Sequence, residues 1–184
     1  MTEEIQQNMR PLGILLTLGM LLAMLSGSAY SQSGGAVVQR IQEGDTAYTN
    51  NFKDIVKLRN GSEIQPLTMI NTEGKSKVML LWRGGLFTSL GESSSISSAS
   101  EQPNGPVSQI QVVQGIARFR TDPSAANPVP YKVTTPMASI RPASEDQPAD
   151  YVVEVYKPST TILTVLCGKV GVANVSSGSQ QETV

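Results

Sequence analysis

Three apolar segments of the chain share one pattern, which constrains the fold more than any other feature. Each is a short apolar strand, one or two intervening residues, a glycine, and a second short strand, and they span residues 77–87, 110–119 and 162–172. The glycine allows the backbone to turn or bulge where a side chain would clash. The recurrence predicts an all-β fold in which stacked hairpins form a β-solenoid-like or barrel-like sheet, and ordinary hairpins are the alternative.

The apolar runs are separated by stretches that predict loops. Aromatic residues make up only 5% of the chain, which also has 16 glycines and 11 prolines, a composition that favours turn-rich β structure. We predict one β domain over residues 36–175, preceded by a flexible linker at residues 32–35. Within it, the serine-rich stretch 91–108 is low in apolar residues and is predicted to be a mobile loop. The polar tail, residues 176–184, is predicted to be disordered.

The dipeptide Asn60-Gly61 is the strongest hairpin signal in the sequence. It lies between two alternating runs, residues 54–58 and 63–67. Asn-Gly favours the positive backbone angles of a tight turn, so the two runs are predicted to pair as a hairpin. Gly44-Asp45 predicts an earlier turn of the same kind.

The N-terminal residues are typical of an export signal. Residues 12–25 are uncharged and apolar, shorter than the roughly 20 residues of a membrane-spanning helix but suited to a signal-peptide core. Ala29 and Ser31 supply the small side chains that signal peptidase requires, so we predict a helical signal peptide over residues 1–31. Translation from Met9 would give it the usual basic start. The alternative is an uncleaved anchor in the inner membrane.

Composition excludes several classes of site. The chain has no histidine, which rules out Ser-His-Asp and Cys-His nucleophiles and histidine-ligated metals. Its single cysteine cannot close an intramolecular disulfide. The net charge of −1 gives no electrostatic reason to bind nucleic acid or an anionic membrane surface. We therefore expect no catalytic residues, no metal site, no cofactor and no nucleic-acid partner, and membrane contact only through an uncleaved leader.

Two polar features of the sequence are candidate chemical sites. Glu145, Asp146 and Asp150 form the densest acidic cluster, which could serve a carboxylate-only glycan-active enzyme but is interpreted as a solvated loop. Cys167 follows an apolar strand beside Lys169. It is predicted to be a buried, inert residue rather than a reactive thiol.

Trp82, Arg83 and Phe87 are the candidate binding residues. Together they could form an aromatic and cationic recognition patch. Alternation along the strand places Trp82 on the same face as Val78 and Leu80, and Arg83 on the opposite face. A core position is the preferred interpretation for Trp82, and a binding role is the alternative.

The order of these motifs resembles the FecR domain of bacterial envelope signalling proteins. The stretch VKLRNGSEIQPLTMI resembles its "L-x-D-G-S-x-V-x-L" hairpin, with Asn60 in place of the usual aspartate. Further along, IQVVQGIARF, YKVTTPMASI and TTILTVLCGKVGVANV resemble the family's later strands in the same order. The resemblance covers most of the chain after the leader.

This resemblance implies a stand-alone exported FecR-like domain in the periplasm or outside the cell. Only about a dozen residues precede the apolar stretch, so we expect no sigma-factor-binding segment like that of the family's complete regulators. The expected function is a non-enzymatic binding or scaffolding module that contacts an envelope protein, a glycan or a second copy. The alternatives are a membrane-anchored sensor fragment of an iron-uptake-type signalling system and a carboxylate-only glycan-active enzyme.

Overall fold

The computed structural model describes residues 35–42, 47–50, 55–100, 106–122, 124–125, 128–144, 147–157, 159–175 and 181–183. All of them belong to one compact unit, Ser33–Val184. Every regular element in these ranges is a β-strand, which confirms the all-β prediction. The described residues contain no helix long and apolar enough to cross a membrane. The predicted signal peptide and the Gly44-Asp45 turn lie outside these residues.

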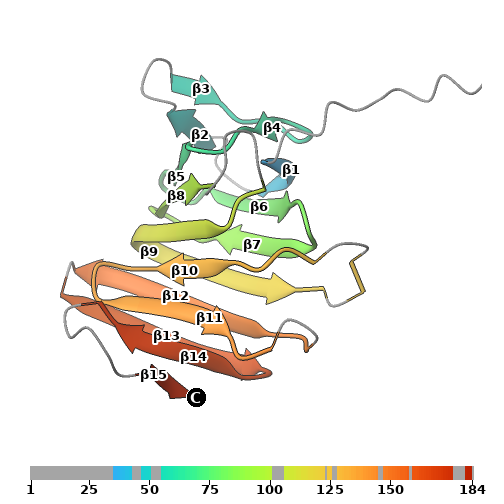
Figure 1. Cartoon of the computed structure of the whole chain (residues 1–184). Coiled ribbons are helices and arrows are strands. Elements are labelled where there is room, and N and C mark those ends of the chain that lie inside the picture. Colours follow the sequence, from blue (N-terminus) through green and yellow to red (C-terminus); the bar gives the residue numbers. More distant parts are fainter. Residues whose placement is uncertain are drawn as a thin grey trace, which may run out of the picture. The chain divides into compact units, whose positions relative to one another are not determined.

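The strands form two sheets that share one long strand (Figure 1). Sheet A has the order β4–β1–β6–β7–β9–β12–β13, and every neighbouring pair in it is antiparallel. Its strands are β1 (Ala36–Gln42), β4 (Glu63–Ile64), β6 (Lys77–Trp82), β7 (Leu86–Leu90), β9 (Gln109–Thr121), β12 (Asp150–Lys157) and β13 (Thr160–Cys167).

Sheet B has the order β3–β2–β5–β8–β9–β10–β11–β14–β15, in which only β9 and β10 run parallel. Its remaining strands are β2 (Ala47–Asn50), β3 (Ile55–Lys57), β5 (Met69–Thr72), β8 (Ser95–Ala99), β10 (Lys132–Thr134), β11 (Ala138–Pro142), β14 (Val170–Asn174) and β15 (Gln181–Thr183).

Strand β9 passes from sheet B to sheet A at Gly115. Residues 109–114 pair with β8, and residues 115–120 pair with β12. Gly115 has φ = 84°, a left-handed conformation that residues with a side chain rarely adopt. The predicted backbone irregularity at this glycine is confirmed. The segment is one continuous strand rather than a hairpin, however, and the first of the three repeated segments is the one that folds as a hairpin, β6–β7.

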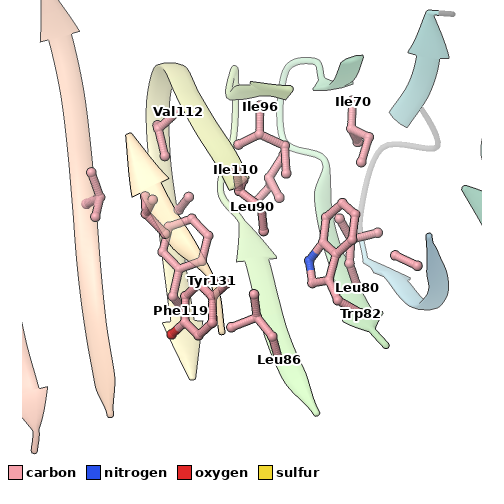
Figure 2. Close-up of a cluster of buried hydrophobic side chains, with 14 of the residues drawn as sticks. Ile70, Leu80, Trp82, Leu86, Leu90, Ile96, Ile110, Val112, Phe119 and Tyr131 are labelled. Carbon is pink, nitrogen blue, oxygen red and sulfur yellow. The ribbon is translucent and has the colours of Figure 1, made fainter. Parts of the chain in front are cut away.

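Alternating residues of both sheets build one hydrophobic core. In β6, Val78, Leu80 and Trp82 point inward, as the sequence predicts, and each is at most 2% exposed. Figure 2 shows Leu80 and Trp82 among other buried side chains, including Phe119 on β9 and Tyr131 just before β10. Each fully buried side chain of this size contributes about 1.5–3 kcal/mol, so packing across the core holds the two sheets together.

The sheets do not close on themselves, so the prediction of a barrel-like sheet is wrong. Sheet A ends at β4 and β13, and sheet B ends at β3 and β15. Strand β9 changes sheets half-way along its length. The strands on either side of it therefore belong to two sheets instead of one closed barrel. The β-solenoid-like arrangement stays a prediction.

The serine-rich stretch is not the mobile loop that its composition predicts. Within it, residues 95–99 form β8, and Ser94, Ile96 and Ser98 are buried. The Ser94 hydroxyl donates a hydrogen bond to the Glu92 carbonyl and accepts one from the Ile116 backbone N–H, both at 2.9 Å. Small hydroxyl side chains can thus be buried where partners satisfy them, which composition alone does not reveal.

Two further local predictions are corrected by strand pairing. Asn60-Gly61 is a tight turn, closed by Ser62 N donating to Arg59 O at 3.0 Å, with φ = 81° at Gly61. It joins no hairpin, because β3 pairs with β2 and β4 pairs with β1. The tail is not wholly disordered, since β15 pairs with β14.

Candidate binding surface

The structure separates the three candidate binding residues. Trp82 is 2% exposed in the core, where its indole Nε1 donates a hydrogen bond to Thr88 Oγ1 at 2.8 Å. Arg83 is exposed in the turn that follows β6. Phe87 is half-buried on β7, with the Arg120 guanidinium 4.9 Å from its ring centroid. Burial therefore agrees with the preferred core interpretation of Trp82, and the three side chains do not form one patch.

The face of sheet A that points away from the core carries a mixed apolar and cationic surface, which we call the outer face. The β6, β7, β9 and β12 register places Met79, Ser89, Arg118 and Val152 in one row across it. Met79 is 40% exposed. Its other large side chains include Leu81, Phe87, Ile116, Arg120, Glu154 and Ile162. Alternation could have assigned most of these to an outward position, but only the strand register shows that they are neighbours.

An ion pair between Arg118 and Asp150 lies on the outer face. Arg118 Nε and Nη2 donate to the two carboxylate oxygens of Asp150 at 2.8 and 2.5 Å. The hydrogen bond from Arg118 holds the pKa of Asp150 below its usual range, and the same bond raises the pKa of Arg118. The pair restrains the guanidinium of Arg118, whose side chain remains 49% exposed.

A shallow pocket of about 250 Å³ lies in the outer face. Its apolar lining includes Met79, Ile116 and Val152, and its cations are Arg40, Lys77 and Arg118. An apolar floor bordered by positive charge suits an apolar contact that carries nearby acidic groups.

A second pocket, of about 320 Å³, lies where the β6–β7 turn approaches the loop before β10. Its lining includes Leu86, Val129, Tyr131, Lys132 and Arg141. Burial raises the pKa of Tyr131 to about 12, so this hydroxyl stays protonated at physiological pH and cannot act as a base there.

Strand β13 forms an open edge of sheet A. It pairs with β12 and with no other described strand. Cys167 lies at its end and is exposed, so the prediction of a buried cysteine is wrong. The apolar strand before Cys167 indicated an apolar environment, but Cys167 pairs with Asp150 on the outer face, at the edge of the sheet.

The predicted acidic cluster is only partly described. Glu145 and Asp146 lie outside the described residues, and Asp150 is engaged by Arg118. Among the residues that the structure describes, no group of three or more Cys, Asp or Glu side chains could hold a metal ion.

Comparison with known families identifies the chain. The family model described as FecR protein matches residues 68–171, more than half of the sequence. The chain belongs to the FecR protein family. The match runs from the start of β5 to β14 and so includes the crossing of β9 between the sheets. FecR proteins are a signalling-related, non-enzymatic family associated with the cell envelope. No curated protein matches the sequence significantly.

Proposed function

We propose that this FecR protein is an exported, non-enzymatic binding or scaffolding module of the bacterial cell envelope. The observation that carries the proposal is the outer face of sheet A, which combines exposed apolar side chains with oriented guanidinium groups on a rigid β framework. Membership of a signalling-related family supports it. Packing of the hydrophobic core holds the strands of sheet A in place. The side chains that point away from the core then form the proposed binding surface.

The physical basis of binding on this face is apolar burial, with cations setting orientation. Met79 and Ile116 are 40% and 37% exposed, and covering them contributes about 25 cal/mol for each Å² removed from water. In the sheet register, Arg120 lies opposite Phe87, and Arg118 lies opposite Ser89, which in turn pairs with Met79. We propose Phe87 and Arg83 as contact residues, and Trp82 as a core support for the strand that carries Met79.

The test combines capture of partners with an assay for turnover. The tagged natural protein and its Met79→Ala/Ile116→Ala variant would be used to capture partners from the native envelope. A Lys75→Ala variant, altered in an exposed turn, is the matched control. We expect the double variant to lose partner binding at least tenfold and the control to keep it. Raising the salt concentration to about 0.5 M should weaken binding only slightly, because apolar contacts are not screened.

Two results would favour the alternative functions. Hydrolysis of envelope glycans that disappears on substitution of Glu145 or Asp146 would establish the carboxylate-only enzyme and contradict the binding module. Retention of the leader in the inner-membrane fraction would favour the anchored sensor fragment.

A further inference from the structure

We propose that the free edge of β13 accepts an extended strand from another polypeptide, one with alternating apolar residues and acidic residues at both ends. This inference rests on the proposed binding function and specifies where and how a partner adds to sheet A. Strand addition uses main-chain hydrogen bonds for affinity and side-chain contacts for selectivity.

The first argument is the chemistry of the edge itself. Strand β13, Thr160–Cys167, has eight residues without a charge or a proline. The other described edges are short: β4 has two residues, β3 has three and β15 has three. Proteins usually protect long edges with lysine, proline or bulges, because unpaired N–H and C=O groups attract other strands. Strand β13 has neither lysine nor proline, and its own irregularity, at Leu166 near its C-terminal end, leaves Thr161–Val165 regularly paired with β12.

The second argument is a difference in strand number between the two sheets. On the β7 and β8 side of the shared strand β9, each sheet continues for four strands. On the other side, sheet B continues for four strands, β10, β11, β14 and β15, whereas sheet A continues for two, β12 and β13. Figure 1 shows β14 and β15 at the same end of the molecule as β13.

This difference leaves room beside β13. Neighbouring strands are about 4.8 Å apart, so two strands correspond to a width of roughly 10 Å. Leu163 and Val165 on the inner side of β13, and Val172 on β14, are only partly buried although they pack against the core. An added strand would cover these side chains and complete sheet A opposite the end of sheet B.

The same geometry argues against a second copy as the occupant. Antiparallel pairing of two β13 edges about a two-fold axis would continue sheet A from one copy into the other and place both B sheets on the same side. The β14 and β15 strands of each copy would then occupy the same space. A single extended segment or a hairpin fits beside β13 without this overlap.

Charges at the ends of β13 indicate the chemistry of the incoming strand. Lys157 precedes the strand and Lys169 follows it, and both are exposed. Neither makes an ion pair within the described part of the chain. Because β13 is uncharged between them, an apolar strand with an acidic residue near each end complements the edge.

The test uses a synthetic peptide as the probe. It is an eight-residue peptide of alternating valine and threonine with aspartate at each end, capped at both termini and fluorescently labelled. One control peptide has proline at its two central positions, and another has lysine in place of aspartate. Binding to the natural protein would be measured by fluorescence anisotropy, and its location by amide hydrogen exchange.

We expect the aspartate-flanked peptide to bind and to slow exchange of alternate β13 amides at least tenfold. The proline peptide should bind at least tenfold more weakly, because it cannot complete the hydrogen-bond ladder. A Lys157→Glu/Lys169→Glu variant should prefer the lysine-flanked peptide, whereas a Lys75→Glu variant should keep the original preference.

Equal binding of the proline peptide, or peptide binding that leaves β13 exchange unchanged, would overturn the proposal. Protection of β13 by increasing protein concentration alone would assign the edge to a second copy and also overturn it. The proposed function can be tested apart from strand addition. It would stand if an envelope partner slowed amide exchange only on the outer face. It would fall if the protein hydrolysed envelope glycans instead of binding a partner.

Discussion

Gly115 provides the most direct test of how the two sheets are joined. A Cβ atom built at this residue would lie 2.6 Å from the Ser94 Cα, which is backbone and cannot rotate away. It would also contact the Ser94 hydroxyl, which bonds the Glu92 carbonyl and the Ile116 N–H. The Gly115→Ala substitution should therefore destabilise the protein in two ways. Alanine is strained in the left-handed conformation, and the buried segment around Ser94 must move.

The expected loss can be worked from these contributions. The left-handed conformation costs about 1 kcal/mol for alanine relative to glycine. Disturbing two hydrogen bonds adds about 0.5–1.5 kcal/mol for each. Overpacking at backbone adds about 1 kcal/mol or more, so the free energy of unfolding should fall by about 3–5 kcal/mol.

Gly61 is the matched control for this substitution. Its φ of 81° is close to the 84° of Gly115, but a Cβ atom at Gly61 would meet nothing within 4 Å. Gly61→Ala should therefore cost only the conformational contribution, about 1 kcal/mol. In urea, with a slope of about 2 kcal/mol per molar, the midpoints should fall by about 2 M for Gly115→Ala and 0.5 M for Gly61→Ala. Equal shifts would refute the close approach of β9 to Ser94.

Three further predictions concern the core, the outer face and the leader. Thr88→Val should leave the Trp82 indole N–H buried without its acceptor and lower the free energy of unfolding by about 1–3 kcal/mol in urea titration, whereas Thr88→Ser should cost less. Because the folded-state pKa of Asp150 is depressed, its stabilisation is present above pH 4 or so and is lost as the pH falls through the folded pKa. The Asp150→Asn variant should lack this contribution when its free energy of unfolding is measured against pH. The contribution is less than about 1 kcal/mol, because Arg118 is exposed. If the variant lost stability in acid as steeply as the natural protein, the pairing would be contradicted. Intact mass of the exported protein should show loss of residues 1–31, and a bulky residue at Ser31 should block processing.

The features that the sequence predicted correctly are those that depend on residues close together in the chain, such as strand alternation and turn glycines. Alternation in β6 correctly assigned Trp82 to the core side, and the glycines after Trp82 correctly predicted the β6–β7 hairpin. The order of the motifs also carried the family resemblance that the family model confirms.

Features that depend on distant partners could not be predicted. The buried position of Ser94 requires an N–H from β9, more than twenty residues away. The Asn60-Gly61 turn forms as expected, yet its flanking strands pair with β2 and β1 rather than with each other. Likewise, the exposure of Cys167 follows from β13 lying at an edge, a property of sheet order.

Site-specific photo-crosslinking in intact cells would test the central claim, that this protein binds an envelope polypeptide through sheet A. A photoreactive amino acid would replace Ile162, which is 44% exposed on the outer side of β13, and in a control chain Lys75. The account predicts one discrete crosslinked polypeptide from position 162 and none from position 75. The same product from both positions, or no product from position 162 while the protein hydrolyses envelope glycans, would contradict it.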